Sequence, residues 1–222
     1  MLSLLRSQEI FNPKEYNYPI TIIGAGAIGS RVFAHLFELG LTNITVYDDD
    51  IVENHNLNNQ NFSLTDVGNN KVHGLYDWAT RKAGIRELPG TFHFFARRVT
   101  PDTEISGTVF LLVDSLETRA YLFKSWSENY AIPRVIDVRM SASHGNVFCV
   151  SPHTDADAYL ATIGSDEDAE VSACGSPYSV SPTAGFLSSL AVWQYINAVK
   201  DDSAEKRINV YLNPLVVTPA SL

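Results

Sequence analysis

A glycine-rich turn between an apolar strand and a helix constrains the fold of this chain more than any other feature. The strand is predicted at Pro19–Ile23, and the sequence Gly-Ala-Gly-Ala-Ile-Gly follows it from Gly24 to Gly29. Gly24 permits a tight turn, Gly26 lets the backbone approach a pyrophosphate, and Gly29 lets the next helix pack against the strand. The N–H groups and the dipole of that helix favour phosphate groups. The unit therefore predicts a Rossmann-like α/β fold with a phosphate site at its first helix.

An acidic turn follows the second predicted strand, Asn43–Tyr47. Asp48 lies 19 residues beyond Gly29, where a carboxylate at a strand end accepts hydrogen bonds from ribose hydroxyls. We expect functional roles for Asp48 and Asp50, and a solvated position for Asp49. These features fit ATP and NAD equally, so they do not choose between the two nucleotides.

Strands and helices alternate along the rest of the chain. The further strands are expected at 91–96, 108–113, 134–138, 146–150 and 207–212, and the helices at 27–39, 65–83, 116–130 and 181–199. Ser181 is predicted to cap the last helix, with Pro182 at its first position. The alternation predicts a doubly wound, mostly parallel sheet with an antiparallel extension. We expect an N-terminal arm with a short helix at 1–18, a single domain at 19–212 with a crossover loop at 151–180, and a loose tail at 213–222.

The composition is that of an ordinary globular domain. With 222 residues, of which 45% are hydrophobic, the chain is long enough for one substantial core. Its net charge of −9 argues against a protein that coats nucleic acid. Its two cysteines, Cys149 and Cys174, cannot form a disulfide framework or a four-cysteine zinc site. Neither a signal peptide nor an apolar run of roughly 20 residues is visible, so we expect a cytoplasmic protein without a membrane segment.

Several segments in combination resemble the ThiF/MoeB family of adenylyltransferases, which are homologous to ubiquitin-activating enzymes. Cys174 stands eight residues before Pro182, which is similar to the family's cysteine ahead of its Pro-x-x-Gly helix. Asp137–Met140 resembles the compact ThiF-like proteins of phages and mobile elements. The other matching segments are Ile22–Ser30, Val46–Glu53, Asn56–Gln60, Asp66–Gly68, Lys71-Val72 and Asp114–Arg119.

The resemblance implies that a homodimer uses ATP and Mg²⁺ to adenylate the C-terminal carboxylate of a small ubiquitin-like or sulfur-carrier protein that ends in glycine. Lys71 would neutralise charge on the phosphoryl oxygens, and Asp114 would bind magnesium. These two residues and Cys174 are the candidate catalytic residues. Carboxylate and triphosphate are both anionic, so positioning and charge neutralisation are the main tasks. The nucleotide-binding residues that the resemblance implies are Gly24, Gly26, Ala27, Ile28, Gly29, Asp48, Asp50, Asn56, Asn59, Gln60 and Lys71.

Three departures from the family pattern stand beside these matches. Asn59 occupies the place where larger members have an arginine that would contact the γ-phosphate, and the candidate substitutes are Arg6, Arg31 and Arg139. The paired Cys-x-x-Cys zinc ligands are absent, so no structural zinc is expected. We expect no sulfurtransferase domain after the adenylation domain.

Alternatives remain open at two points. Cys149 is expected to be a buried thiol in an apolar strand, whereas Cys174 lies among small residues with no lysine or arginine nearby to lower its pKa. In some relatives a cysteine at this place forms a covalent intermediate with the activated partner, and in others it is dispensable. The chain alternatively reads as an NAD-dependent oxidoreductase, which would leave Asn56–Lys71 without a role. A third reading is a nucleotide-binding scaffold that lost turnover with the missing arginine.

Overall fold

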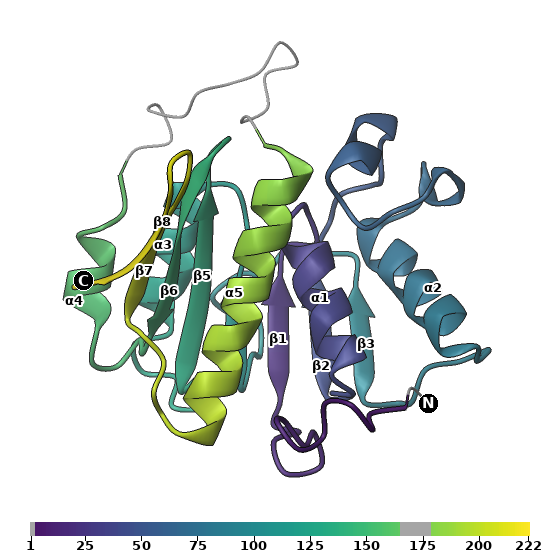
Figure 1. Cartoon of the computed structure of the whole chain (residues 1–222), viewed down its shortest axis with the longest axis horizontal. Coiled ribbons are helices and arrows are strands. Elements are labelled where there is room, and N and C mark those ends of the chain that lie inside the picture. The colour runs from purple at the N-terminus through teal and green to yellow at the C-terminus, as the bar shows by residue number, and fades with distance from the viewer. Residues whose placement is uncertain (1–2, 165–178) are drawn as a thin grey trace.

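One mixed sheet organises the molecule. The strands are β1 (Ile20–Ile23), β2 (Ile44–Tyr47), β3 (Phe92–Phe95), β4 (Thr108–Leu111), β5 (Arg134–Met140), β6 (His144–Val150), β7 (Arg207–Leu212) and β8 (Leu215–Ala220). The computed structural model describes residues 3–164 and 179–222, and there the strands form one sheet in the order β3-β2-β1-β4-β5-β6-β7-β8 (Figure 1). Strands β3, β2, β1, β4 and β5 pair in parallel, and β6, β7 and β8 extend the sheet in antiparallel order.

Helices cover both faces of this sheet. The helices are α1 (Gly29–Glu38), α2 (Lys71–Ala83), α3 (Leu116–Ser125), α4 (Ala156–Leu160) and α5 (Ser181–Lys200), with 3₁₀ segments η1 (Asn54–Asn58) and η2 (Leu64–Asp66). Helices α1, α2 and α5 lie on one face, and α3 and α4 lie on the other (Figure 1). The predicted doubly wound α/β fold with an antiparallel extension is thus confirmed. No helix in the described part of the chain is long and apolar enough to cross a bilayer.

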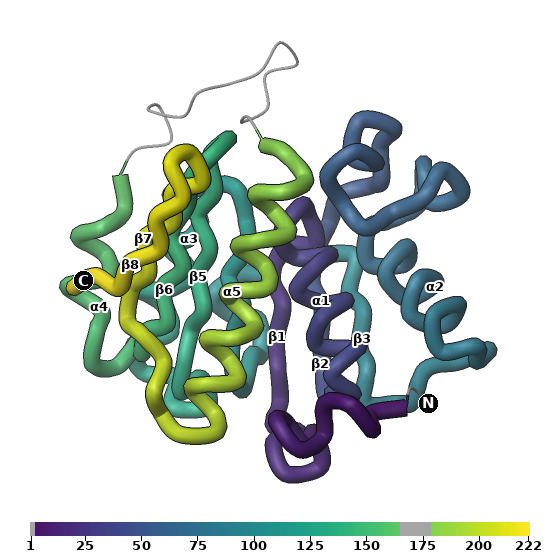
Figure 2. Tube along the Cα trace, viewed as in Figure 1, coloured from purple at the N-terminus to yellow at the C-terminus, as the bar shows by residue number. Residues whose placement is uncertain are grey.

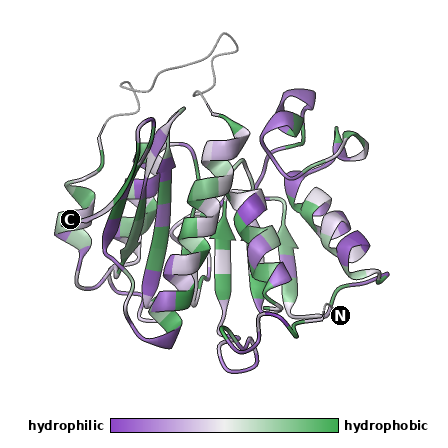
Figure 3. Cartoon of the chain, in the orientation of Figure 1, coloured by the Kyte–Doolittle hydropathy of each residue, from purple (hydrophilic) through white to green (hydrophobic). Residues whose placement is uncertain are grey.

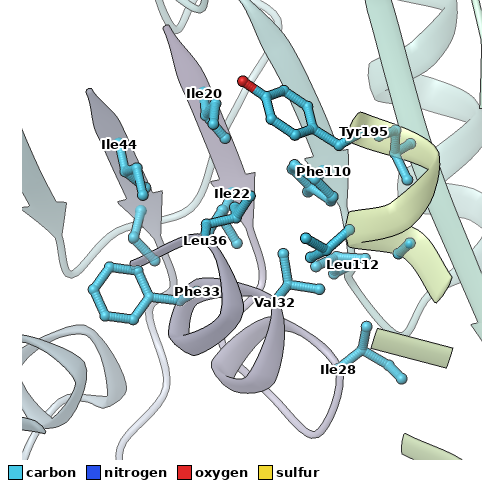
Figure 4. Packing of buried hydrophobic residues seen from close by; sticks show 14 of the residues in the cluster. Ile20, Ile22, Ile28, Val32, Phe33, Leu36, Ile44, Phe110, Leu112 and Tyr195 are labelled. Carbon is cyan, nitrogen blue, oxygen red and sulfur yellow. The ribbon is translucent and has the colours of Figure 1, made fainter. Parts of the chain in front are cut away.

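Each face of the sheet carries its own apolar core. Successive residues of a strand point to opposite faces, so β1 supplies Ile22 to one core and Ile23 to the other. Ile22 lies in the cluster that contains Phe33 of α1 and Tyr195 of α5 (Figure 4). Ile23 belongs to the cluster that contains Tyr159 of α4. Figure 3 shows β1 without strongly hydrophilic residues and α1 with both hydrophilic and hydrophobic ones, as expected for a central strand and an amphipathic helix.

The segment between β2 and α2 differs from the prediction. The helix was expected from Thr65, but α2 begins at Lys71. Residues 65–70 are held instead as part of the loop, where Ile51 and Asn70 form an antiparallel bridge. The Val52 N–H donates to the Asn69 carbonyl at 2.8 Å, and further main-chain contacts fold the loop back on itself. The helical spacing of this stretch is therefore overridden by pairing with residues that follow the acidic turn.

Three smaller expectations about the remaining elements are corrected. Helix α3 ends at Ser125 rather than near Tyr130. The N-cap of α5 is Val180, and Ser181 is the first helical residue without a capping bond. The crossover at 151–180 contains the short helix α4, whose N-cap region is held because the Asp155 carboxylate accepts the Ser151 N–H at 2.8 Å.

Both ends of the described chain pack more closely than expected. The predicted loose tail is wrong, because 215–220 forms the edge strand β8 in a hairpin with β7. The arm before β1 forms successive turns rather than a helix. Phe11 of the arm is 1% exposed and stacks on Tyr16 at 5.3 Å. The Tyr195 hydroxyl donates to the Tyr16 carbonyl at 3.1 Å, which ties the arm to α5.

Candidate functional site

The predicted site segments meet where the parallel strands end. Strands β1, β2 and β4 pair in parallel, so their carboxyl ends share one edge of the sheet. The turn after β1, the segment between β2 and α2, and the start of α5 all lie at this edge (Figure 2). The glycine turn, the acidic turn and Asp114 therefore reach one edge from three separate parts of the sequence.

The glycine turn is shaped by two glycines and open at a third. Gly24 has a φ of +97°, and its N–H donates to the Tyr47 carbonyl at 2.9 Å. A Cβ at Gly29 would lie 1.8 Å from the Gly24 carbonyl oxygen, so no side chain fits between α1 and the turn. A Cβ at Gly26 would meet no atom within 4 Å. The turn therefore requires Gly24 and Gly29, whereas Gly26 borders open space.

The N-terminus of α1 offers unpaired main-chain donors. In residues 3–164 and 179–222, no protein acceptor is recorded for the N–H groups of residues 26–29, and no side chain caps the helix at Ile28. The Ile28 side chain is buried in the core and Ala27 is half-buried, so both residues offer a ligand their main-chain groups. Free N–H groups at the positive end of a helix dipole form an anion site.

Asp48 ties the acidic turn to the glycine turn. One of its carboxylate oxygens accepts the Ala25 N–H at 2.6 Å, and the other accepts the Asp50 N–H at 2.9 Å. Burial raises the pKa of this carboxyl, and the charge of Lys71 partly offsets that effect. A carboxylate has about four acceptor positions, so Asp48 retains capacity for hydroxyl donors of a ligand.

Lys71 and Asp50 form an ion pair at the start of α2. The Lys71 Nζ lies 2.6 Å from Asp50 Oδ2; the lysine side chain is 8% exposed and the aspartate side chain 61%. The Lys71 N–H also donates to the Asp50 carbonyl at 3.0 Å. The ammonium is thus held at the sheet edge by a carboxylate that water already solvates. Asp49 points elsewhere and pairs with the exposed Arg98 at 2.7 Å, as expected for a solvated turn residue.

The three predicted amide residues of the loop have different environments. Asn56 is buried, and its Oδ1 accepts the Glu53 N–H at 2.8 Å, so it caps η1. Asn59 donates from Nδ2 to the Ser179 hydroxyl. The Oδ1 of Asn59 and the Oε1 of Gln60 are buried and lack a hydrogen-bond partner among the described residues. Asn56 therefore shapes the loop, while Asn59 and Gln60 keep unused hydrogen-bonding capacity.

Asp114 is exposed on the loop between β4 and α3. Its Oδ1 accepts the N–H of Ser115 at 2.9 Å. Within the described residues, no three His, Cys, Asp or Glu side chains gather into a metal-binding group. Mg²⁺ is commonly held by one or two carboxylates together with substrate phosphates and waters, so a single exposed carboxylate beside a phosphate site fits that ion.

The three candidate arginines are far apart in the fold. Arg6 is exposed on the N-terminal arm. That arm runs along the edge of the sheet opposite the glycine turn (Figure 1). Arg139 is engaged with the buried Asp137 and donates to the Thr162 carbonyl at 2.8 Å. Arg31 lies in the first turn of α1, at the edge of the site. Arg31 is therefore the arginine that the fold brings to the predicted nucleotide residues.

Two serines join this site although no local sequence signal marks them. Arg31 donates from one terminal nitrogen to the Ser181 hydroxyl at 2.8 Å and to the Asn59 carbonyl at 3.4 Å. Ser179 accepts the amide of Asn59. The partners are separated by 120 and 150 residues of sequence, so only the packing of α5 beside α1 brings them together.

The structure describes only one of the two cysteines. Cys149 is 4% exposed on β6, and burial raises the pKa of its thiol to about 12, which agrees with the predicted inert thiol. Cys174 lies outside the described residues.

A cavity of about 480 Å³ between Pro19, Gly107 and Ala131 contains none of the predicted site residues. The predicted site residues therefore lie outside this cavity.

The chain belongs to the ThiF family, whose family model matches residues 14–215. A curated relative is the ATP-dependent ubiquitin transferase-like protein Cap2 of Enterobacter hormaechei subsp. hoffmannii (strain UCI 50). It is 32% identical over 62 residues, which make up 28% of this chain and 10% of Cap2.

Solved structures share the fold. Escherichia coli MccB with AMPCPP and MccA has a TM-score of 0.74 and 18% identity, covering 94% of this chain and 64% of MccB. MccB with ATP has a TM-score of 0.72 and 17% identity, with 94% and 64% of the two chains covered. PaaA has a TM-score of 0.71 and 16% identity, covering 98% of this chain and 69% of PaaA. The chain thus spans less than two thirds of MccB and a tenth of Cap2.

Proposed function

We propose that this chain is an adenylyltransferase that uses ATP to activate the C-terminal carboxylate of a peptide or small protein. The observation that carries the proposal is the junction of the glycine turn, Asp48, Asp50 and Lys71 at one edge of the sheet. Direct hydrogen bonds link these groups, which places free helix N–H donors, a carboxylate and an ammonium together. Membership of the ThiF family and the fold shared with MccB, which has been crystallised with ATP, support a nucleoside triphosphate as the ligand.

In the proposed reaction each group has a physical task. A carboxylate oxygen of the acceptor attacks the α-phosphorus, the bond from that phosphorus to the bridging oxygen breaks, and pyrophosphate leaves with the bonding electrons. The N–H groups of residues 26–29 hold phosphate oxygens, and Asp48 accepts the ribose hydroxyls. Lys71 reduces the repulsion between the two anionic reactants and stabilises charge on the phosphoryl oxygens. Asp50 holds Lys71 in place.

Magnesium belongs to the proposal through Asp114. When bound there, the ion would neutralise phosphate charge and favour the in-line geometry. The exposed Asp114 carboxylate is the protein ligand that we assign to it. We assign Asn59 and Gln60 to the phosphate side of the nucleotide site. Asn56 supports the loop that carries them by accepting the Glu53 N–H.

The finer identity of the acceptor is also a proposal. We propose a small ubiquitin-like or sulfur-carrier protein with a C-terminal glycine, taken up by a cytoplasmic homodimer. The local identity with Cap2 supports a ubiquitin-like acceptor, whereas the fold shared with MccB, crystallised with MccA, supports a short peptide. An optional second step is transfer of the activated acceptor to Cys174, by attack of the thiolate on the acyl carbon and departure of AMP.

Exchange of labelled pyrophosphate into ATP tests the proposed function. We expect exchange that depends on an acceptor ending in Gly-Gly and that is abolished in Asp114→Ala. Asp102→Ala, which changes an exposed aspartate on a turn outside the site, is the matched control and should exchange at the wild-type rate. Binding of NADH in preference to ATP would favour the oxidoreductase. ATP binding without exchange, over a panel of acceptors, would favour the scaffold.

A further inference from the structure

Arg31 is a cation in an electrostatically unfavourable place. It is the third residue of α1, whose first turn contains no acidic residue. The N-terminus of a helix carries partial positive charge, so a cation there is repelled and an anion is favoured. The arginine is nevertheless half-buried at this position.

No counter-charge compensates Arg31 in the described part of the chain. Five other arginines there lie within 4.0 Å of a carboxylate oxygen, and Arg31 does not. Its recorded contacts are to neutral oxygens, the Ser181 hydroxyl and the Asn59 carbonyl. Its Nε is buried without a partner. A half-buried guanidinium beside a helix N-terminus, whose recorded contacts are to neutral oxygens, would be stabilised by a bound anion.

The neighbouring amides can adapt to the same anion. The unpaired oxygens of Asn59 and Gln60 belong to side chains that present N–H groups after rotation by about 180°. For Asn59 this rotation keeps the contact with Ser179, because a hydroxyl accepts from an amide nitrogen or donates to an amide oxygen equally well. Arg31 and Asn59, which are in contact, and Gln60, the next residue of the loop, can therefore all present N–H groups.

We propose that Arg31 binds the β- and γ-phosphates of the nucleotide and stabilises the departing pyrophosphate. The inference rests on the proposed function and specifies which residue carries the triphosphate end. The main-chain carbonyl of Asn59 accepts from the guanidinium at 3.4 Å and helps to orient it. An arginine on the first helix then supplies the charge that position 59 lacks.

The test compares ATP with AMP, because only ATP carries the phosphates that Arg31 would contact. Calorimetric titration should show ATP affinity reduced about 10- to 100-fold in Arg31→Ala, as expected for the loss of a charge-assisted hydrogen bond, with AMP affinity unchanged. Arg31→Gln removes the charge but keeps a polar side chain at this half-buried position, so it should lose ATP affinity while unfolding near the wild-type temperature. Arg86→Ala, at an exposed loop position, is the matched control and should bind both nucleotides normally.

A compensating variant separates phosphate binding from a role in holding the loop. Asn59→Arg added to Arg31→Ala should recover the preference for ATP over AMP, because it returns a guanidinium to the same place. An equal loss for ATP and AMP in the single variants, or no loss, would overturn the assignment of Arg31. If the wild-type protein bound no ATP at all, the proposed function would fail first and this inference with it.

Discussion

Two clusters of charge lie along the sheet of this protein, and they are built in opposite ways. Asp137 on β5 is fully buried, with one oxygen bound by Arg119 and the other by Arg139 at 2.8 Å and the Tyr159 hydroxyl at 2.9 Å. Asp50 at the end of β2 has a largely exposed carboxylate and one recorded side-chain partner, Lys71. We call these the closed cluster and the open cluster.

The difference shows which charges hold the fold and which remain for a ligand. In the closed cluster the protein supplies a donor to each oxygen of Asp137, and the Arg139 guanidinium also stacks 4.3 Å from the ring of Phe148. A buried charge that loses its partner is costly, so this cluster cannot exchange partners for a ligand. The open cluster retains solvated oxygens and free N–H groups beside it. What separates the two clusters is therefore not charge but exposure: the Asp137 carboxylate is buried, and the Asp50 carboxylate faces solvent.

The largest effect is expected from opening the closed cluster. Asp137→Asn removes the buried carboxylate charge that pairs with Arg119 and Arg139, which should lower the free energy of unfolding by about 3–5 kcal/mol. Asp49→Asn breaks an ion pair that is exposed, and should cost less than about 1 kcal/mol. Urea unfolding of both variants measures the contrast. Similar losses in the two variants would contradict the distinction between the clusters.

Cys149 reports on the same closed region, since it lies on β6 beside the strand that carries Asp137. Only the thiolate reacts with iodoacetamide, and a pKa raised from 9.0 to about 12 leaves the thiolate about 10³-fold rarer near pH 8. In a Cys174→Ser variant we expect negligible labelling of the native protein at that pH and full labelling in denaturant. If mass spectrometry detected fast labelling of the native protein, this strand would have to open readily.

Removing the charge of the open cluster should affect activity rather than stability. Lys71→Met keeps the buried aliphatic stem and removes the ammonium, while Asp50 stays solvated. We expect pyrophosphate exchange to fall about 10²- to 10³-fold, as for other lost electrostatic stabilisers of a transition state. The free energy of unfolding should change by less than about 1 kcal/mol. A variant that unfolds easily but exchanges at the wild-type rate would reverse the roles of the two clusters.

The smallest effects separate the glycines of the turn. Gly26→Ala places a methyl group in open space, so stability should change by no more than about 0.5 kcal/mol while ATP affinity drops about tenfold. Gly29→Ala should instead lower the melting temperature, because its Cβ would collide with the Gly24 carbonyl. Calorimetric titration measures the ATP affinity of both variants, and thermal unfolding measures their melting temperatures. Unchanged ATP affinity in Gly26→Ala would mean that no phosphate lies beside the open side of the turn.

Much of the architecture was predictable because it depends on neighbouring residues. The β-branched run before Gly24 and the helical stripe after it identify a strand, a turn and a helix without reference to the rest of the chain. Asp48 follows β2 and Asp114 follows β4. Because these strands run in parallel with β1, both aspartates lie at the same edge of the sheet. The edge strand β8 was missed, although Val216 and Val217 favour strands, because pairing with β7 decides whether such a short run is ordered.

The site was less predictable than the fold. Asn56 matches a family motif by sequence, yet its position in η1 commits its side chain to a capping bond. The resemblance implies nucleotide-site roles for Lys71 and Asp50 but not their ion pair. The burial of Lys71 follows from where α2 begins, which helical spacing placed six residues too early. Such misplacement arises because hydrogen bonds in the loop compete with the intrinsic preference of the same residues for a helix.

The sequence by itself determined the order of strands and helices, the glycine turn and the acidic strand end, because each depends on side chains within a few residues of one another. Tertiary structure alone decided which of three arginines reaches the site, and that Ser179 and Ser181 adjoin it. It also decided that Asp137 is buried with both oxygens paired, while the Asp50 carboxylate is exposed. Those outcomes depend on contacts between segments up to 150 residues apart, which local periodicity does not encode and which form only when α5 packs beside α1.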